Sequence, residues 1–477
     1  MASHPWLADP EPTIKTLGEL RESGWVSRPV KDEIREHTLE KITSGEIMFP
    51  GVQGYDDTVI PQLQHALLAK HDMVLLGERG QAKTRIIRSL TGLMDPWMPI
   101  IAGSEINDDP YSPVSRYARD LVAAEGDATA ITWVPAADRY GEKLATPDTS
   151  IADLIGEVDP IKVAEGRYLS DELTLHYGLV PRTNRGVFAI NELPDLAERI
   201  QVGLLNVLEE RDVQVRGYKV RLPLDVMLVA SANPEDYTNR GRMITPLKDR
   251  FGAQIRTHYP YDMDIEANVA HQEAFIPNNG LPVRIPEFMT SIIVRFTHLA
   301  RRSGQVNQRS GVSVRMSTTN LETLAAAATA RSLRLGETIV VPRICDLDAI
   351  FPSSAGKIEI ESLDEGRDEE ILDLLLSAAI VEEFRAHIDG ALIHQITASF
   401  EEDDSVVSTG DDIVAAEYTS ILNSKPALAA AVAAVIGDET APEMTASAVE
   451  LVLEGMHLTK RLNKDAVGGR SSFRARY

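Results

Sequence analysis

Short uninterrupted apolar runs punctuate the first half of the chain. Residues 73–76 (Met-Val-Leu-Leu) are all apolar and end at Gly77, and similar runs occupy residues 98–102, 130–134, 187–190 and 226–230. An apolar run of this length predicts a strand that is buried on both faces of a parallel sheet. Helical patterns lie between several of the runs, notably over residues 194–208. Strands that alternate with helices indicate an α/β fold with a mainly parallel sheet flanked by helices.

One segment departs from this alternation. Apolar and polar residues alternate across residues 212–224, around Arg216-Gly217-Tyr218. This pattern predicts a β-hairpin between the helix that ends near Leu208 and the next core strand. The tip of the hairpin is expected to be exposed and to serve as a contact surface.

After Tyr261 the strand signals fade and helical patterns follow. Phe288, Ile292 and Phe296 fall on one face of a helix. Further helices are expected over residues 314–335, 369–387, 426–436 and 445–462, and nearer the N-terminus over residues 31–42 and 59–69. Residues 1–29 and the basic residues 468–477 are expected to be loosely ordered, and the acidic run 401–404 to be a solvated loop.

Length and charge narrow the class of protein. A chain of 477 residues exceeds the size at which one core usually keeps growing, so two or three domains are expected. The formal net charge is -24. Binding along a nucleic-acid backbone needs Lys and Arg to displace counterions, so this charge counts against DNA or RNA as the main substrate.

The single cysteine and the apolar segments of the chain indicate its redox chemistry and its compartment. Cys345 is the single cysteine, and no histidine-bearing motif accompanies it, so a buried inert thiol is expected. The first residues lack a basic-then-apolar signal region. The most apolar run, residues 427–436, is far shorter than the roughly 20 residues of a membrane-spanning helix. We therefore expect a cytoplasmic protein without membrane insertion.

A phosphate-binding loop follows the first apolar run. Gly77-Glu78-Arg79-Gly80-Gln81-Ala82-Lys83-Thr84 comes directly after the predicted strand and opens a helix at Arg85. In such a loop, main-chain amides hold phosphate oxygens, Lys83 neutralises the outer phosphates, and the Thr84 hydroxyl ligates Mg²⁺. Ala82 stands where the usual motif has glycine. ATP and Mg²⁺ are the expected cofactors, and the nucleotide contacts are expected from Gly77, Glu78, Arg79, Gly80, Gln81, Ala82, Lys83, Thr84 and Arg85.

The apolar run 187–190 ends in Asn191-Glu192. Hydrolysis needs a carboxylate that orients the attacking water, and Glu192 is expected in that role; the alternative is that Glu192 only caps the next helix. Asn191 occupies a position that normally carries Asp beside Mg²⁺. An amide oxygen still accepts a hydrogen bond from metal-bound water but brings no negative charge, so weakened Mg²⁺ binding or turnover is expected.

Three further polar residues follow the later elements. Asn233 ends the strand over residues 226–230 and is placed to bridge the water and the γ-phosphate. Arg250, in Asp249-Arg250-Phe251, is a candidate arginine finger for a neighbouring subunit, or a surface ion-pair residue. Arg315 opens a predicted helix and either senses the nucleotide or caps that helix.

The order of these pieces resembles the AAA+ ATPases of the magnesium-chelatase I-subunit and MoxR group. The resemblance runs from about Phe49 to Leu335 and includes the opening loop Phe49-Pro50-Gly51-Val52-Gln53-Gly54. It implies that Asn233 is the first sensor, Arg250 the finger and Arg315 the second sensor. Asn191 departs from the pattern.

The resemblance also implies an organisation. We expect an N-terminal extension (1–45), an AAA+ nucleotide-binding domain (46–262), a helical lid (263–350) and a helical C-terminal extension (351–477). Because the finger of one subunit completes the site of the next, the resemblance implies a homo-hexamer.

Three functions remain open from the sequence. The first is a MoxR-like motor that remodels a client protein together with a partner that carries a von Willebrand A domain. The second is the motor subunit of a magnesium chelatase, which inserts Mg²⁺ into a porphyrin; the long C-terminal region favours the first over the second. The third is a nucleotide-gated scaffold with little turnover, supported by Asn191. A DNA helicase or a transcription activator is disfavoured by the acidic charge and by the lack of a Gly-Ala-Phe-Thr-Gly-Ala loop.

Overall fold

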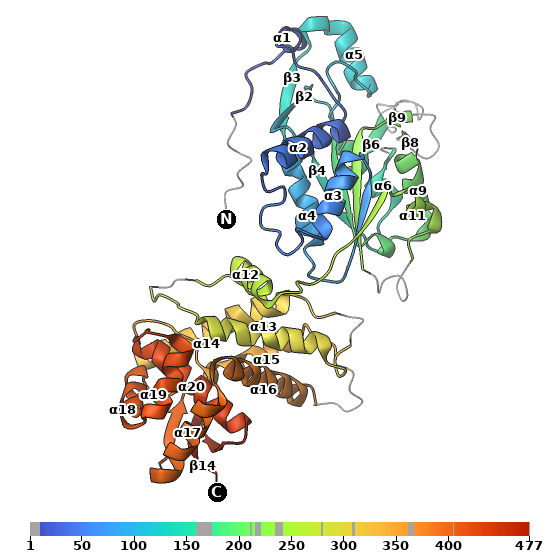
Figure 1. Ribbon diagram of the computed structural model, residues 1–477. Helices are drawn as coiled ribbons and strands as arrows, with labels where there is room; N and C mark the ends of the chain where they lie inside the picture. Colours follow the sequence, from blue (N-terminus) through green and yellow to red (C-terminus); the bar gives the residue numbers. More distant parts are fainter. Residues whose placement is uncertain are drawn as a thin grey trace. The chain divides into compact units, whose positions relative to one another are not determined.

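The computed structural model divides the chain into two compact units, Met1–His258 and Tyr259–Tyr477 (Figure 1). The structure describes residues 10–158, 174–209, 212–214, 221–233, 242–277, 280–307, 311–360, 367–403 and 405–476. Each unit is described by itself.

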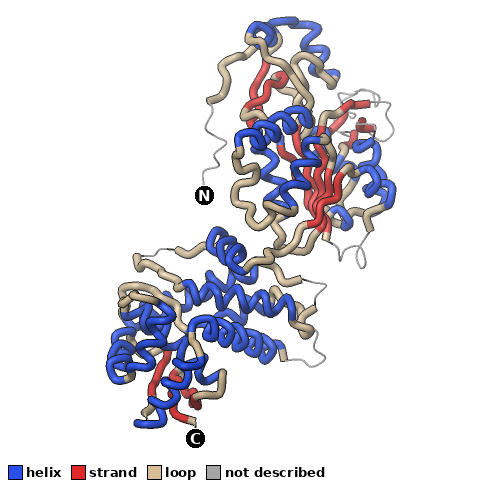
Figure 2. Tube along the Cα trace, in the orientation of Figure 1, coloured by secondary structure: helices blue, strands red, loops and turns tan. Residues whose placement is uncertain are grey.

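A five-stranded parallel sheet forms the centre of the first unit, as the sequence predicts (Figure 2). Its strands, in spatial order, are β11 (Ala253–Arg256), β1 (Met73–Leu76), β10 (Val226–Ala232), β7 (Gly186–Asn191) and β4 (Tyr140–Leu144). Every residue of β1, β7 and β10 is buried. Their continuous apolar runs therefore mark the three inner strands, because both faces of an inner strand are covered.

Helices cover both faces of this sheet. Alternate residues of the strands, among them Leu75, Ala189 and Val229, pack with residues of three helices on one face. These helices are α2 (Val30–Ser44), α3 (Val59–Leu68) and α4 (Lys83–Ser89). The intervening strand residues, such as Phe188 and Ala230, pack on the other face with α9 (Glu198–Glu209) and α11 (Thr245–Arg250). The α/β fold class is confirmed.

Two of the predicted core strands lie outside the main sheet. β2 (Trp97–Ile101) and β3 (Ile131–Pro135) pair antiparallel in a sheet of their own, with α5 (Arg116–Glu125) between them in the chain. Thr132 of β3 is exposed, so this strand is covered on one face only. The prediction that residues 98–102 and 130–134 belong to the parallel sheet is wrong. The polar edge strand β4 takes that place.

The N-terminal segment is more ordered than its composition indicates. Helix α1 (Leu17–Glu22) begins with a capping box in which Thr16 and Glu19 exchange hydrogen bonds. Leu17 and Leu20 are fully buried, and Leu20 packs beside Trp133 of β3. For residues 10–29, the expectation of loose order is therefore wrong.

Short elements complete the first unit. The predicted hairpin is present as β8 (Asp212–Gln214) and β9 (Arg221–Pro223), while Arg216-Gly217-Tyr218 lies outside the described residues. A second hairpin joins β5 (Gly156–Val158) and β6 (Leu175–Tyr177). The remaining short helices are η2 (Leu90–Leu93), η3 (Gly126–Ala128), η4 (Ala136–Arg139), α6 (Ile151–Leu154), α8 (Leu179–Arg182) and η6 (Leu193–Asp195).

The second unit is mainly helical. Its helices are α12 (Met263–Glu273), α13 (Glu287–Arg302), α14 (Arg315–Leu335), η7 (Ile344–Ile350), α15 (Phe351–Ala355), α16 (Asp368–His387), α17 (Gly390–Asp403), α18 (Ala415–Ser424), α19 (Pro426–Ile436) and α20 (Pro442–Leu458). One apolar cluster combines Phe288 and Phe296 of α13 with Leu376 of α16 and Leu451 of α20. The segments expected as lid and C-terminal extension thus share a core.

Two local expectations can be compared with this unit. Burial raises the pKa of the Cys345 thiol, which keeps it protonated and agrees with an inert side chain. Glu401 and Glu402 are exposed as expected, but they end helix α17 and do not form a loop.

The C-terminal region also contains a sheet, which the sequence analysis did not predict. β12 (Val407–Gly410), β14 (Arg470–Ala475) and β13 (Leu462–Val467) pair antiparallel in that order. The expectation of a loosely ordered tail after Gly468 is wrong, because Phe473 and Ala475 are buried in the core beneath this sheet. Gly468 and Gly469 both have positive φ and form the turn between β13 and β14.

Within the part of the chain that the structure describes, no helix is long and apolar enough to cross a membrane.

Candidate nucleotide-binding site

The loop Gly77–Thr84 connects the buried end of β1 to α4, as the sequence predicts. Gly80 and Ala82 both have left-handed backbone conformations, with φ of 77° and 54°. A non-glycine residue in this region costs roughly 1–2 kcal/mol, so Ala82 holds a strained position that glycine would accept freely. The strain indicates that the loop is held in shape by its surroundings.

Gly77 lies in a space that no larger residue fits. A Cβ atom at this position would lie 1.9 Å from the Thr257 hydroxyl oxygen and 2.2 Å from Oε1 of Gln81. The Thr257 hydroxyl donates to this same Oε1 (2.7 Å), and so does the backbone N–H of Glu78 (3.0 Å). The buried Gln81 side chain therefore braces the loop against the residue that comes directly after β11. The sequence analysis placed Gln81 in the site but missed Thr257.

Lys83 points into the loop from the start of α4. Its side chain is buried, and its ammonium group donates to the backbone oxygens of Gly77 and Glu78 and to Oδ1 of Asn233, the last at 2.8 Å. Asn233 comes directly after the end of β10. The structure thus brings together two of the residues that the sequence nominated from segments 150 positions apart.

Glu192 is joined to the same group. Its Oε2 accepts a hydrogen bond of 2.8 Å from Nδ2 of Asn233. Its backbone is left-handed (φ 54°), and its N–H donates to the Ser231 hydroxyl at 3.2 Å. The unusual backbone at the end of β7 turns the Glu192 side chain toward Asn233. Lys83, Asn233 and Glu192 form a continuous hydrogen-bonded chain along the carboxyl ends of β1, β10 and β7.

Asn191, the last residue of β7, contacts two side chains that the sequence analysis did not nominate. Its Oδ1 accepts from the Ser231 hydroxyl (3.2 Å), and its Nδ2 donates to Oε1 of Glu142 on β4. Glu142 also pairs with Arg88 of α4 at 2.9 Å. This hydrogen bond to Glu142 raises the pKa of Arg88. A carboxylate therefore lies directly beside the position where the usual Asp is missing.

The opening loop packs against the phosphate loop. The Tyr55 hydroxyl oxygen lies 2.7 Å from the backbone oxygen of His258 and 3.0 Å from that of Gln81, so its one hydrogen is donated to either of them. The Tyr55 ring meets the His258 ring edge to face. Arg85 reaches the backbone oxygen of Gly51 at 3.4 Å. The two loops are thus fixed to each other by residues from both.

The remaining nominated residues lie at the ends of helices. Thr84 is exposed at the start of α4. Arg250 is the last residue of α11 and donates to the backbone oxygen of Pro246 at 3.0 Å. Arg315 is the exposed first residue of α14 in the second unit, where its backbone N–H bonds to the Ser313 hydroxyl. Both arginines open or close helices as predicted, and their roles stay predictions.

The residues present fit a nucleotide and Mg²⁺. The Lys83 ammonium is held among main-chain groups of the loop at the start of α4, an arrangement that suits a phosphate. The Thr84 hydroxyl, the Asn191 amide oxygen and the Glu142 carboxylate are oxygen donors of the kind that Mg²⁺ prefers. These donors lie on or beside α4, β7 and β4.

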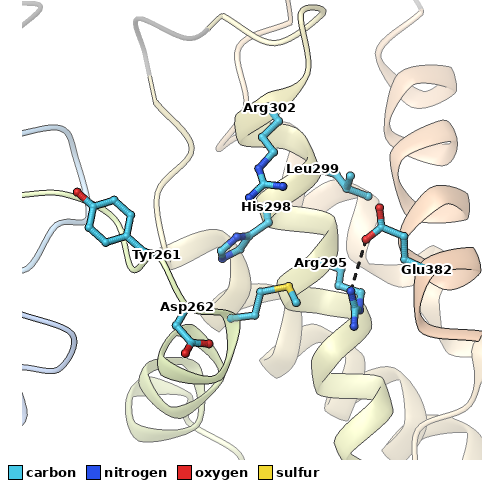
Figure 3. A pocket seen from close by; sticks show the side chains of 8 residues that line it. Tyr261, Asp262, Arg295, His298, Leu299, Arg302 and Glu382 are labelled. Atoms are coloured by element: carbon cyan, nitrogen blue, oxygen red, sulfur yellow. Dashed lines mark hydrogen bonds and ion pairs between the residues drawn. The ribbon is translucent and has the colours of Figure 1, made fainter. Parts of the chain in front are cut away.

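A separate pocket of about 500 Å³ lies in the second unit (Figure 3). It is lined by Tyr261, Asp262, Met263, Arg295, His298, Leu299, Arg302 and Glu382. Arg295 pairs with Glu383 at 2.7 Å, and His298 lies 2.9 Å from Glu266. Burial raises the pKa of Glu266, but hydrogen bonds from His298 and Arg301 outweigh it and lower the pKa overall. Because two of its basic side chains already pair with carboxylates, we assign no ligand to this pocket.

Two sequence comparisons identify similar proteins. Residues 165–251 match the sequence profile of the Sigma-54 interaction domain, which covers β7, β10 and α11. A magnesium-chelatase subunit ChlI from Euglena gracilis is 28% identical over 232 residues. These matches support an AAA+ ATPase of the magnesium-chelatase I-subunit and MoxR type. The matched residues make up 46% of this chain and 62% of the Euglena subunit.

Solved structures show low overall similarity to this chain. The complex of BchI and BchD of magnesium chelatase has a TM-score of 0.35 at 19% identity and covers 68% of this chain and 99% of that one. NtrX from Brucella abortus in complex with ADP has a TM-score of 0.36 at 12% identity, covering 76% and 65%. A putative ATPase from Cytophaga hutchinsonii has a TM-score of 0.31 at 15% identity, covering 75% and 97%. The similarity to this family rests on the two sequence matches.

Proposed function

We propose that the chain binds ATP with Mg²⁺ at the loop Gly77–Thr84 and hydrolyses it. The observation that carries this proposal is the hydrogen-bonded chain of Lys83, Asn233 and Glu192. It places a cation, an amide and a carboxylate at the carboxyl ends of three neighbouring parallel strands, where ligands bind in open α/β sheets.

Each residue has a task that its contacts support. Lys83 bonds to Gly77, Glu78 and Asn233, and it exchanges some of these bonds for phosphate oxygens when a nucleotide enters. Asn233 holds Glu192 by its Nδ2, and the carboxylate accepts a proton from the attacking water. Bound Mg²⁺ neutralises the charge of the phosphates. Thr84 and Asn191 are the metal contacts expected from the sequence.

Calorimetry with ATP and Mg²⁺ tests the nucleotide site. Lys83→Ala is expected to remove the binding heat. Lys15→Ala, which changes an exposed lysine near the N-terminus, is the control and should leave the binding heat unchanged. Glu192→Gln is expected to keep binding and to stop turnover. ATP binding that persists at full strength in Lys83→Ala would contradict the proposal.

The assembly and biological role follow the MoxR side of the family. The motor is a homo-hexamer in which Arg250 of one subunit completes the next site, and it remodels a client protein with a partner that carries a von Willebrand A domain. The family resemblance and the length of the chain beyond residue 351 support this role. A Glu192→Gln variant used as an affinity trap in the native cell should capture such a partner, and its absence from the captured proteins argues against this role.

The similarity to the Euglena ChlI subunit favours a second candidate, the motor of a magnesium chelatase. Metal insertion into protoporphyrin by the purified protein with its partners would establish this second function in place of remodelling.

Asn191 favours a third candidate, a nucleotide-gated scaffold with little turnover. Brisk hydrolysis by the native chain that Glu192→Gln abolishes would exclude it.

A further inference from the structure

We propose that Glu142 supplies the negative charge that Asn191 lacks beside Mg²⁺. The inference rests on the proposed nucleotide site and adds a carboxylate to it from a different strand. The family pattern places this charge at the end of the strand that carries Glu192; here the same strand ends in an amide, and the carboxylate comes from its neighbour β4.

Strand register puts Glu142 on the required face. β4 pairs with β7 in parallel, with Glu142 opposite Ala189. Side chains alternate along a strand, so Asn191, two residues beyond Ala189, lies on the same face as Glu142. Ala189 packs on the face that α2, α3 and α4 cover. Glu142 and Asn191 therefore both lie beneath α4, the helix that starts in the phosphate loop.

Side-chain contacts agree with this placement. Oε1 of Glu142 accepts from Nδ2 of Asn191, and its Oε2 accepts from Nε of Arg88 at 2.9 Å and from the Tyr140 hydroxyl at 3.1 Å. Arg88 is one helical turn beyond Thr84, so the two side chains lie along one face of α4. Arg88 thus connects Glu142 to the helix face that carries the expected Mg²⁺ hydroxyl.

The exposure of the Glu142 and Arg88 side chains bears on whether their ion pair is mainly structural. The Glu142 side chain is 22% exposed, and the Arg88 side chain is 63% exposed. The Arg88 side of this ion pair is exposed to solvent, so the pair by itself contributes only about 0–1 kcal/mol to stability. The Asn191 amide that donates to Glu142 keeps its Oδ1 turned to Ser231. Among Glu142, Arg88, Asn191 and Ser231, Glu142 is the side chain that offers a negatively charged oxygen.

The test measures how Mg²⁺ changes nucleotide affinity, using calorimetry with a non-hydrolysable ATP analogue with and without Mg²⁺. Glu142→Gln preserves the shape of the side chain and removes its charge. Changes in the surroundings of a metal typically alter its affinity by about 10–100-fold, so the enhancement by Mg²⁺ should fall by about this factor. Binding without Mg²⁺ should stay unchanged. Glu46→Gln, which removes an exposed carboxylate two residues beyond the end of α2 and paired with Lys41, is the matched control.

A double variant that exchanges the carboxylate and the amide between positions 142 and 191 provides a second test. Glu142→Gln/Asn191→Asp moves the carboxylate back to β7 and keeps one amide and one carboxylate in contact. This double variant should recover the enhancement by Mg²⁺, which loss of folding in the single variant could not imitate.

The outcomes are distinct. An unchanged Mg²⁺ enhancement in Glu142→Gln, or no recovery in the double variant, overturns the role of Glu142. If the native chain binds the analogue and Lys83→Ala does not, the nucleotide site itself stands whatever happens at Glu142. If the native chain binds no analogue at all, the proposed function fails and this inference falls with it.

Discussion

The ion pair between Glu33 of α2 and Arg139 of η4 gives a sharp test of how the first unit is held together. Nη1 and Nη2 of Arg139 each donate to one carboxylate oxygen of Glu33 at 2.7 Å. The two side chains are 1% and 4% exposed for Arg139 and Glu33. Nε of Arg139 donates to the backbone oxygen of Arg185, and the backbone N–H of Asp95 donates to Glu33. The pair therefore joins four segments of the chain.

The perturbation is Glu33→Gln, which keeps the volume and removes the charge. The guanidinium of Arg139 then stays buried without a counter-charge, and breaking a buried pair in this way costs about 3–5 kcal/mol. A hydrogen bond to a charged group contributes about 1.5–3 kcal/mol, and two are weakened here. Because glutamine retains one acceptor oxygen, we expect a loss near the lower end, about 3 kcal/mol.

Tryptophan fluorescence in denaturant is the assay. All four tryptophans lie within the first 133 residues, so their signal follows unfolding of the first unit. Trp25 and Trp133 contact each other edge to face with ring centroids 5.5 Å apart, and this contact is lost on unfolding.

Two comparisons make the result decisive. Asp127→Asn breaks a pair with Arg21 whose side chains are 67% and 55% exposed, and it should cost less than about 1 kcal/mol. The double variant Glu33→Leu/Arg139→Met replaces the pair with apolar side chains and should recover most of the loss. If Glu33→Gln costs no more than Asp127→Asn, the reasoning about burial is wrong.

Three further predictions concern the same unit. Arg250→Ala should leave ATP binding intact and lower turnover by about 10³-fold or more, as for loss of an arginine finger, and unchanged turnover refutes that role. Ala82→Gly removes roughly 1–2 kcal/mol of left-handed strain against about 0.5–1 kcal/mol of added chain entropy, so the denaturation midpoint should stay level or rise while ATP affinity is kept. The hydrogen bond to Asp95 raises the pKa of His37 above its ordinary 6.5. The protonated His37 therefore contributes fully to the stability of the fold below pH 6.5, and this stabilisation is lost as the pH rises through the higher pKa of the folded state. Between about pH 6 and pH 8.5 the native chain should lose more stability than His37→Gln, and parallel curves would count against this linkage.

The parts of the fold that the sequence revealed are those that burial on both faces dictates. The runs at β1, β7 and β10 are inner strands, and continuous apolar residues have no other easy place. An edge strand such as β4 needs no such run, so its polar residues concealed it. The runs at β2 and β3 are equally apolar, and only their tertiary pairing decides that they form a separate sheet.

The C-terminal sheet could have been found from a local signal. Two successive glycines, Gly468-Gly469, between short segments of mixed polarity are typical of a two-residue hairpin turn. The basic composition of the segment instead favoured a tail. The other antiparallel partner of β14 is β12, where Val407 pairs with Phe473, 66 positions later in the chain. Nothing local in the sequence indicates this pairing.

The residues of the candidate site also fall into those that the sequence predicts and those that only the tertiary structure reveals. Lys83, Asn233 and Glu192 come after apolar runs or belong to a loop motif, so their convergence could be predicted from parallel strands ending at one edge. Glu142 and Thr257 could not, because their contacts depend on the register of β4 and on the position of the chain just beyond β11. Neither residue belongs to a recognisable motif.

The clash that any side chain at Gly77 would meet has an evolutionary consequence. The Thr257 and Gln81 side chains occupy the space that a methyl group at Gly77 would need, so these two residues fit only beside a glycine. A substitution at one of the three positions therefore changes which residues the other two tolerate. Among relatives, these three positions are expected to covary, with alanine at the first accompanied by a smaller residue at 257 and a shorter one at 81.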